Sequence, residues 1–359
     1  MADKLRCGII GTGMIGKTHV NRYNDIAEAE IVAVCDLRED EAQRVAAANG
    51  IPAVYVDYKE MLKIEEIDII DVCLPNELHC PVTCDALKAG KHVYCEKPMA
   101  NSAAEARKML KTAEETGNTL MIQLGTLFGN DAHAAKRVID AGMLGKIYYA
   151  KSSYYRRRGR CYVDGYATPA FVQKEVAGGG ALADMGVYHL GLMVWLLGNP
   201  EVKTVSASTF QEIPMDKKRA KESGYSVEEF ATGFIRFEGD ITMFFEEAWA
   251  THMEGEGTGF RVFGSEGGVR VDPFAFYTDI GGMQADVNFN VGMYEGREGL
   301  IQGDEHKAMR NQQMNLVWHL LGRVPLIDTA PIACKVAEIT EAMYKSSDAD
   351  REVRVPKRK

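Results

Sequence analysis

A glycine-rich turn near the start of the chain constrains the fold more than any other stretch. The apolar run at residues 5–10 leads into G-x-G-x-x-G, at Gly11, Gly13 and Gly16, and helix-compatible sequence follows. Gly11 allows a tight turn from strand to helix, Gly13 lets backbone approach a pyrophosphate, and Gly16 lets helix and strand pack closely. The amides and dipole at the helix start favour a negatively charged group there.

A second apolar run supplies the partner that this turn needs. Residues 31–35 end in Asp36, twenty residues after Gly16. An acid at this distance accepts hydrogen bonds from an adenosine ribose, and it repels a 2′-phosphate. We therefore expect a dinucleotide site for NAD, with NADP disfavoured, although Arg38 nearby would soften that choice.

Strand and helix patterns alternate over the first third of the chain. Continuous apolar strands separated by helices are typical of a parallel sheet covered on both faces. We predict a doubly wound Rossmann domain over residues 1–125. Its expected strands are residues 5–10, 31–35, 54–56, 67–73, 92–95 and 120–124, and its helices are 15–26, 38–49, 58–63, 81–89 and 103–116.

The pattern changes after residue 125. Apolar and polar residues alternate with period two in several runs, which suits a mostly antiparallel sheet. We predict an α/β protein whose second domain, residues 126–359, is α+β with a large open sheet. The expected strands are 147–155, 204–210, 229–237, 241–250, 259–263, 269–271 and 353–355, and the helices 133–141, 184–197, 312–321 and 332–345. The glycine-rich residues 277–303 give no assignment.

Composition narrows the class of protein. The chain has 359 residues, 46% of them hydrophobic, and a net charge of −9, which argues against nucleic-acid or anionic-membrane partners. The richest apolar run, residues 190–197, is too short to span a membrane, and there is no signal-peptide pattern.

Eight cysteines without C-x-x-C fit reduced thiols in a cytoplasmic protein. His79, Cys80 and Cys84 do not complete a ligand set, so we expect no metal.

Polar motifs follow two of the predicted strands. Pro75-Asn76-x-x-His79 comes after the fourth strand and Glu96-Lys97-Pro98 after the fifth, at the sheet edge that faces the ligand crevice. Lys97 would point toward the nicotinamide, aimed by a proline bond that is a candidate for the cis form. The alternatives are a helix cap at Asn76 and a solvated loop around Lys97. The expected cofactor contacts are Gly11, Thr12, Gly13, Met14, Ile15, Gly16, Asp36, Leu37, Arg38, Pro75, Asn76, His79, Glu96, Lys97 and Gln123.

Together these segments resemble the Gfo/Idh/MocA family of sugar and polyol dehydrogenases. The resemblance covers nearly the whole chain and is specific for the family, but it is unspecific for the substrate. It implies a Rossmann domain followed by an open-sheet domain that often forms the oligomer interface, so we expect a homodimer or homotetramer. The residues that carry it are Gly11–Gly16, Asp36, Pro75-Asn76-x-x-His79, Ala89-Gly90-Lys91-His92-Val93, Glu96-Lys97-Pro98, Gly142-x-x-Gly145-Lys146-Ile147, Gly178-Gly179-Gly180, Asp184-x-Gly186 and 337–355.

The resemblance implies a catalytic group of Lys97, Asp184 and a residue four positions after Asp184, usually histidine. Here that residue is Tyr188, and His189 comes next. On a regular helix Asp184 and Tyr188 share a face, whereas His189 is turned away by about 100°. A tyrosine base needs its pKa of about 10 lowered, which Lys97 would do, and histidine needs no such help. Helix geometry favours Tyr188, with His189 as the alternative and core packing as the reading without function.

Further candidates for substrate contact are basic residues. Arg156 and Arg158 belong to a cluster that ends a predicted strand, where forked hydrogen bonds would hold substrate oxygens. A solvated loop or a subunit contact explains this cluster better. His306 is one more candidate. The expected substrate contacts are Lys97, Arg156, Arg158, Asp184, His189 and His306.

These features predict an NAD-dependent oxidoreductase that takes hydride from a secondary hydroxyl of a sugar, glycoside or cyclitol. One alternative is an enzyme that keeps and recycles NAD to support glycoside cleavage or hydride exchange between sugars. The other is a non-catalytic protein that senses nucleotide or sugar.

Overall fold

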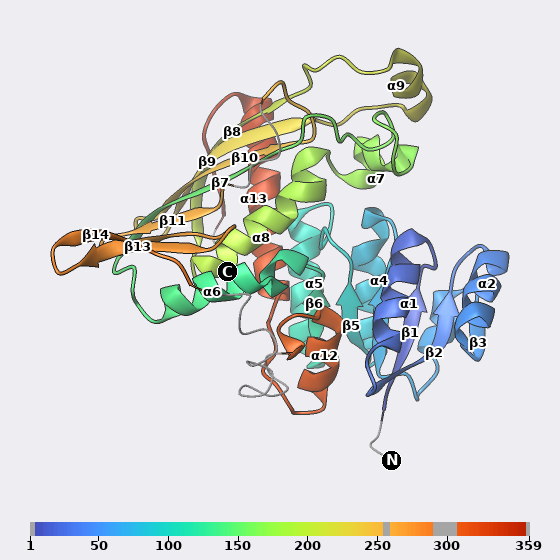
Figure 1. Ribbon diagram of the computed structural model, residues 1–359. Coiled ribbons are helices and arrows are strands. Elements are labelled where there is room, and N and C mark those ends of the chain that lie inside the picture. Colours follow the sequence, from blue (N-terminus) through green and yellow to red (C-terminus); the bar gives the residue numbers. More distant parts are fainter. Residues whose placement is uncertain (1–3, 254–258, 290–306, 357–359) are drawn as a thin grey trace. The chain divides into compact units, whose positions relative to one another are not determined.

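The chain forms two compact units. The computed structural model describes residues 4–253, 259–289 and 307–356 (Figure 1). The first unit contains Met1–Ala100, Ala104–Gln123 and Glu298–Pro331. The second contains Asn101–Ala103, Leu124–Arg297 and Ile332–Lys359.

The first unit is built on a six-stranded parallel sheet with the order β3-β2-β1-β4-β5-β6. The central strands are almost wholly buried because helices cover both faces, as the continuous apolar runs predicted. The strands are β1 (Leu5–Ile10), β2 (Ala29–Cys35), β3 (Ala53–Tyr55), β4 (Ile69–Val72), β5 (His92–Cys95) and β6 (Leu120–Ile122). The helices are α1 (Met14–Asn24), α2 (Glu39–Asn49), α3 (Tyr58–Leu62), α4 (Asn76–Lys88) and α5 (Ala103–Thr116).

The register of this sheet brings the strand ends level. Ile10 lies opposite Cys35 on β2 and opposite Val72 on β4, and Val72 lies opposite Cys95 on β5. Cys95 in turn lies opposite Ile122 on β6. The residues after each strand therefore meet along one edge, and the strand order reverses between β1 and β4, where such sheets bind ligands.

A late segment of the chain returns to the first unit. Helix α12 (Gln312–Leu320) packs against α1, and the indole N–H of Trp318 donates to Glu28 at 2.9 Å. The Thr329 hydroxyl donates to the carbonyl of Ile122 and accepts from its N–H, both at 2.7 Å. The predicted domain limits, 1–125 and 126–359, stay a prediction, but the compact units differ from them because these contacts tie α12 and Thr329 to the first unit.

The second unit is built on a nine-stranded sheet with the order β14-β13-β12-β11-β7-β10-β9-β8-β15. All its pairs are antiparallel except β7 with β10, so the predicted α/β class with a mostly antiparallel second sheet is confirmed. The strands are β7 (Ile147–Tyr155), β8 (Val202–Phe210), β9 (Phe230–Phe237), β10 (Thr242–Ala248), β11 (Arg261–Gly264), β12 (Gly267–Arg270), β13 (Ala275–Ile280), β14 (Met283–Val287) and β15 (Val353–Arg354). Strands β13 and β14 fill part of the stretch that the sequence left unassigned.

Helices cover one face of this second sheet. Gly186 lies against Phe245 of β10, and Met343 of α13 lies against Gly233 of β9, which is opposite Phe245 in the sheet. The helices are α6 (Asn130–Asp140), α7 (Lys174–Ala177), α8 (Val187–Leu196), α9 (Lys217–Ser223) and α13 (Ala330–Ala349), with 3-10 turns η1 (Gly125–Phe128) and η2 (Pro169–Val172). A π-helical turn, η3 (Leu182–Gly186), leads directly into α8.

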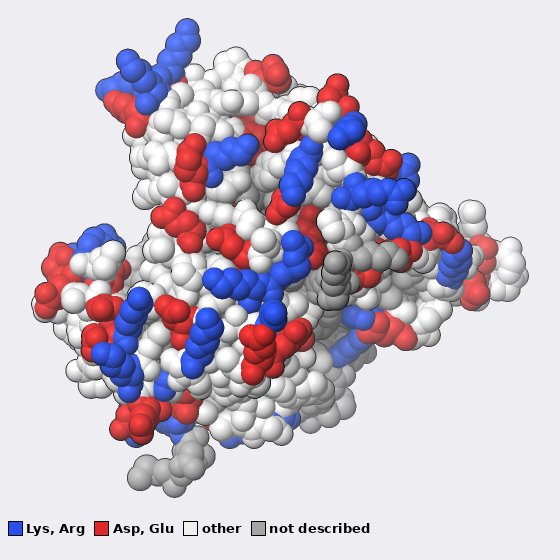
Figure 2. Space-filling model, turned by 180° about the vertical axis from the view of Figure 1, so that it is seen from behind, with Lys and Arg blue, Asp and Glu red and all other residues white. Residues whose placement is uncertain are grey.

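The distribution of charged side chains, the state of the cysteines and the apolarity of the helices can be compared with the expectations from composition. Basic and acidic side chains are mixed in small groups on the face that Figure 2 shows. All eight cysteines lie in the described ranges and are free thiols. Among the described residues, no helix has both the length and the apolarity to cross a bilayer.

Candidate active site

The glycine turn between β1 and α1 has the geometry that its spacing predicted. Gly11 has a φ of +96°, and a Cβ there would collide with the carbonyl oxygen of Cys73. A Cβ on Gly16 would collide with the carbonyl oxygen of Gly11, so only glycine lets α1 approach the strand. A Cβ on Gly13 would have no heavy atom within 4 Å among the described residues. This open space at the start of α1 fits an approaching pyrophosphate.

Asp36 lies beside this turn. Its carboxylate accepts the Thr12 N–H at 2.9 Å, the Thr12 hydroxyl at 3.0 Å and the Arg38 N–H at 2.9 Å. Partial burial acts to raise the pKa of Asp36, but these hydrogen bonds outweigh it and lower the pKa. The acid is therefore a fixed anion at the edge of the turn. Next to it Leu37 is 88% exposed and Met14 of α1 is 74% exposed, as expected of apolar groups that a nucleoside would cover.

The loop after β4 is held by His79. This side chain is fully buried, and its ring nitrogens lie 2.7 Å from the Pro98 carbonyl oxygen and 2.8 Å from that of Leu74. His79 therefore ties the loop after β4 to the loop after β5, and direct contact with a cofactor stays a prediction. The alternative role of Asn76 as a helix cap is wrong, because Pro75 occupies the cap position and Asn76 is the first helical residue.

The loop after β5 carries Glu96 and Lys97. Glu96 is 9% exposed, and its Oε2 accepts the backbone N–H of Lys97 at 3.1 Å. The Lys97–Pro98 bond is cis. Burial would raise the pKa of Glu96, but His19 and the charge of Lys97 keep it low. Gln123 follows β6 at the same edge, and its buried side-chain oxygen has no hydrogen-bond partner among the described residues.

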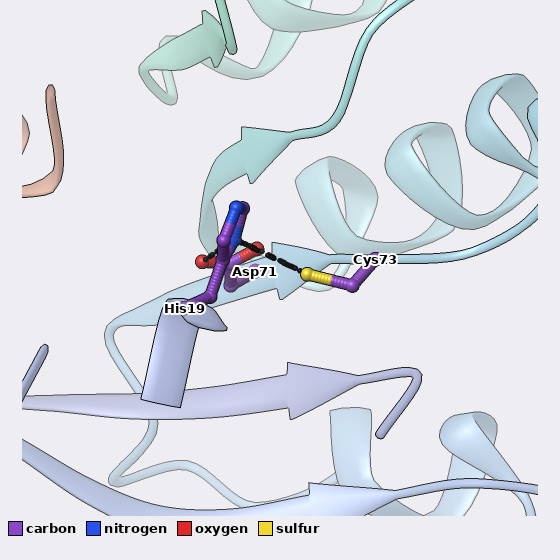
Figure 3. Close-up of side chains that lie close together, drawn as sticks. All are labelled: His19, Asp71 and Cys73. Carbon is purple, nitrogen blue, oxygen red and sulfur yellow. Dashed lines mark hydrogen bonds and ion pairs between the residues drawn. The ribbon is translucent and has the colours of Figure 1, made fainter. Parts of the chain in front are cut away.

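Next to Lys97 in the chain, Glu96 belongs to a charged network with His19 and Asp71 that the sequence did not predict. His19 of α1 is 1% exposed; its Nδ1 lies 2.9 Å from Asp71 of β4, and its Nε2 lies 3.0 Å from Glu96 (Figure 3 shows the Asp71 side). Both ring nitrogens face carboxylates, so both donate and the ring is an imidazolium. Burial would lower the pKa of His19, but Asp71 and Glu96 raise it to about 10.

This network includes the group of described residues with metal-ligand geometry, His19, Asp71 and Cys73. Figure 3 shows the Cys73 thiol beside both partners, at 3.2 Å from each. A histidine must be neutral to bind a metal, and this one is held protonated by two carboxylates. The cluster is therefore an ion pair with a neighbouring thiol, and its residues do not fit a metal site.

In the second unit, the three glycines at 178–180 shape the approach to Asp184. Gly178 has a φ of +78°. Side chains on Gly179 and Gly180 would collide with the Tyr344 hydroxyl and the Glu228 carbonyl oxygen. The half-buried Glu228 accepts the N–H groups of Gly180 at 2.9 Å and of Leu182 at 2.9 Å. It thereby caps the start of the π-turn that carries Asp184.

The expectation of a regular helix from Asp184 onward is wrong. Asp184 lies in the π-turn η3, where i→i+5 bonding inserts an extra residue into the turn. Asp184 is half-buried, and its Oδ2 accepts the indole N–H of Trp249 at 3.1 Å. The argument that Asp184 and Tyr188 share a face of a regular helix therefore does not hold here.

The two candidate bases on α8 differ in their surroundings. His189 is 5% exposed, and its Nδ1 lies 2.5 Å from Oε2 of Glu247. Its ring lies between Tyr154, at 4.8 Å between centroids, and Phe260, at 4.9 Å. Tyr188 is half-buried, and its carbonyl accepts the Thr126 hydroxyl at 2.8 Å.

The arginine cluster divides among different environments. Arg156 lies 3.3 Å from the hydroxyls of both Tyr154 and Tyr166. Burial opposes its charge, but its neighbours, including Tyr154 and Asp184, raise the pKa of Arg156. Arg158 is exposed, and Arg160 is fully buried in ion pairs with Asp164 and Glu229. His306 lies outside the described residues.

Comparison with known proteins agrees with this geometry. Residues 5–124 match the family model described as "Oxidoreductase family, NAD-binding Rossmann fold", and residues 132–270 match "GFO/IDH/MocA C-terminal domain". The chain belongs to the Gfo/Idh/MocA family. The predicted family is thus confirmed, together with its class, an oxidoreductase that uses NAD.

Some individual relatives align over nearly the full chain, and others over about half of it. The D-glucoside 3-dehydrogenase of Escherichia coli (strain K12) is 31% identical over 364 residues, which is 98% of each protein. An inositol 2-dehydrogenase of Salmonella paratyphi B is 31% identical over 205 residues, or 56% of each. A levoglucosan dehydrogenase solved with NADH is 21% identical, covers 99% of this chain and 100% of that one, and has a TM-score of 0.79, which shows the shared fold.

Sequence reasoning missed His19 and Glu247, although each leaves a signal. His19 is three residues after Gly16, so it lies on the helix face that packs against the sheet. Glu247 follows Met243 and Phe245 on the buried face of β10, where period two places a charged residue among apolar ones. A charged residue on a buried face needs a partner of opposite charge or a hydrogen-bond donor, so such a residue is a candidate for a functional site.

Proposed function

We propose that this protein oxidises a secondary hydroxyl of a sugar, glycoside or cyclitol, with NAD as the hydride acceptor. The observation that carries the proposal is the position of Lys97 at the edge of the parallel sheet, where its backbone N–H donates to the buried Glu96. The names of the relatives support it, since D-glucoside 3-dehydrogenase and inositol 2-dehydrogenase are both sugar or cyclitol enzymes. We also propose that Gly11–Gly16, Asp36 and Gln123 contact NAD.

Each polar group has a chemical role in the proposal. The Lys97 ammonium donates to the reacting oxygen and stabilises its developing negative charge. Asp184, held by Trp249, accepts a hydrogen bond from a hydroxyl of the substrate or orients the base. A side chain of α8, His189 or Tyr188, takes the hydroxyl proton. NAD⁺, when bound, accepts the hydride from the same carbon.

Arg156 is the better placed of the two arginine candidates for a substrate oxygen. Arg156 is half-buried, and the charge of Asp184 helps to raise its pKa, whereas Arg158 is exposed to solvent. A forked guanidinium there would bind a second hydroxyl or ring oxygen. Arg158 remains a candidate for a solvated or subunit-facing position.

A substrate screen tests the proposal. Sugars, glycosides and cyclitols are incubated with the protein and either NAD or NADP, and reduced nicotinamide is followed by absorbance. We expect NADH to accumulate in solution with at least one substrate. Turnover of substrate without NADH release would support a retained, recycled cofactor, and absence of reduction even in a single turnover would support a sensing protein.

We also propose that the protein is a homodimer or homotetramer. Strands β13 and β14 expose large apolar side chains, with Ile280 57% and Met283 69% exposed. Such groups at a sheet edge are typical of a surface that another chain covers. Analytical ultracentrifugation at several concentrations measures the mass, and a monomer throughout would contradict this.

A further inference from the structure

Glu247, near the end of β10, is a buried carboxylate with an unusual arrangement of partners. It is fully buried; its Oε2 lies 2.5 Å from Nδ1 of His189, and its Oε1 has no hydrogen-bond partner among the described residues. An unsatisfied buried oxygen is costly, and such groups in folded proteins call for an explanation.

Charged groups surround this pair on several sides. Burial raises the pKa of Glu247, while His189 and Arg156 act to lower it and Asp184 acts to raise it. These neighbours come from the π-turn η3, from α8 and from the residue after β7. Asp184 and His189 therefore both lie near the same buried carboxylate.

That shared neighbour bears on which residue of α8 aligns with Asp184. In a regular helix the residue four positions later would align with it, which is Tyr188. Across the π-turn, Asp184 and the residue five positions later, His189, both act on the charge of Glu247. The sequence argument for Tyr188 rested on the regular helix alone.

The contact also determines which nitrogen of the neutral ring carries hydrogen. An ionised carboxylate only accepts hydrogen bonds, so opposite ionised Glu247 a neutral ring carries its hydrogen on Nδ1, and Nε2 keeps its lone pair. The ring plane is held by Tyr154 and Phe260 on either side. A base needs this combination of fixed orientation and fixed tautomer, and the carboxylate of a hydrolase triad serves its histidine in the same way.

We propose that Glu247 is a positioning residue that holds His189 in the tautomer with hydrogen on Nδ1, so that Nε2 accepts the proton of the substrate hydroxyl. The proton-accepting step rests on the proposed function, whereas the tautomer does not. The reaction balances, because the hydroxyl proton passes to Nε2 and the hydride passes from the carbon to NAD⁺.

Two substitutions of Glu247 separate an acceptor from a charge. Glu247→Leu removes the acceptor at similar volume, and replacing a buried ionic group by an apolar one is often tolerated. Glu247→Gln keeps an acceptor oxygen without the charge. Glu246→Leu is the matched control, since this acid precedes Glu247 on β10, faces the other side of the sheet and bonds to Tyr155.

The tautomer is measured directly by ¹⁵N NMR on histidine-labelled full-length protein without substrate. The His189 signals are assigned by their absence in His189→Gln. We expect a protonated Nδ1 and an unprotonated Nε2 in the wild type, in Glu247→Gln and in Glu246→Leu, and a mixture of tautomers in Glu247→Leu. Hydrogen on Nε2 in the wild type, or an unchanged pattern in Glu247→Leu, would overturn the proposal.

Kinetics on a substrate found in the screen supply the second measurement. We expect Glu247→Leu to lower kcat by about 100-fold or more with little change in KM, because the base is lost from the reacting step. Glu246→Leu should keep the wild-type kcat. An unchanged kcat despite a changed tautomer would overturn the role in proton transfer. If no sugar is oxidised at all, the proposed function fails while the NMR result still decides the role of Glu247 as a positioning residue.

Discussion

Lys97 is linked through Glu96 to His19, which is protonated at neutral pH. The Lys97 backbone N–H binds Glu96, and Glu96 binds His19. We expect Lys97→Met to lower kcat by about 10²–10⁴-fold, the usual contribution of a positioned acid or base, while NAD affinity stays within about threefold. Steady-state rates and NAD titration by protein fluorescence measure the two effects. Lys63→Met, at a 69% exposed lysine, is the control, and full turnover in Lys97→Met would contradict the role.

We propose that Asp36 governs the choice between NAD and NADP. We expect Asp36→Ala to raise the KM for NAD by about 10-fold or more, because hydrogen bonds to a charged acceptor are worth about 1.5–3 kcal/mol. NADP should gain relative to NAD, since the repelling charge is removed and the 64% exposed Arg38 stays in place. The ratio of kcat/KM for NAD and NADP is the measurement.

The control for this change is a nearby acid, Asp40, which lies in the first turn of α2. Asp40 is 80% exposed and makes an ion pair only with its own helix neighbour Arg44 among the described residues. Asp40→Ala should leave the cofactor ratio unchanged. An equal shift in both variants would mean that general surface charge, and not Asp36, sets the preference.

At the scale of elements, His19 joins α1, β4 and β5 through one charged ring. Its pKa is raised from 6.5 to about 10, so the stabilisation is fully present below pH 6.5 and is lost as the pH rises through 10. We expect the free energy of unfolding of the wild type to fall between pH 6.5 and 10 more steeply than that of His19→Gln. Urea denaturation at a series of pH values measures both slopes, and parallel slopes would contradict the charged state of His19.

The glycine-rich segment 178–180 before η3 has no room for side chains at Gly179 and Gly180. We expect Gly180→Ala to destabilise the protein by about 1–3 kcal/mol, the usual cost of overpacking, because its Cβ would meet the Glu228 carbonyl. Gly129→Ala is the control, since its Cβ would come no closer than 3.6 Å to another atom. Denaturant midpoints compare the two, and equal midpoints would show that the loop relaxes around the added methyl group.

Sequence and structure agree where a local pattern decides the geometry. The roles of Gly11 and Gly16 follow from their spacing, because each glycine is required by backbone within its own strand-turn-helix unit or in the neighbouring strand. The apolar runs also predicted the carboxyl ends of β1, β2 and β5, whereas the predicted strands 54–56, 67–73 and 120–124 extend one or two residues past β3, β4 and β6. The π-turn could not be predicted, since one inserted residue in a helix leaves no composition signal.

The partners of the candidate site were harder to predict for a different reason. Glu247 pairs with His189, and Trp249 with Asp184, across about 60 residues of intervening chain. Such pairs depend on strand register and on how helices pack against a sheet, which one sequence does not reveal. His19 and Glu96 pair in the same way across 77 residues.

At the scale of the whole molecule, Trp318 fastens a late helix to the first unit. It is 6% exposed, donates to Glu28, and lies under the guanidinium of Arg323. We expect Trp318→Ala to cost about 3–5 kcal/mol, as for other buried tryptophans. Hydrogen exchange should show the loss of protection in α1 and β2. Equal loss in the strands of the second unit would contradict a local role.

The return of α12 and Thr329 to the first unit also has a consequence for how the protein is made. Chains fold as they emerge from the ribosome, with the N-terminal part first. Here helix α1 and the sheet edge at Ile122 receive their partners, α12 (Gln312–Leu320) and Thr329, only once these late residues have been synthesised. The NAD-binding unit is thus the first to be started and among the last to be completed, and a nascent chain must keep its unfinished surfaces from other proteins for most of translation.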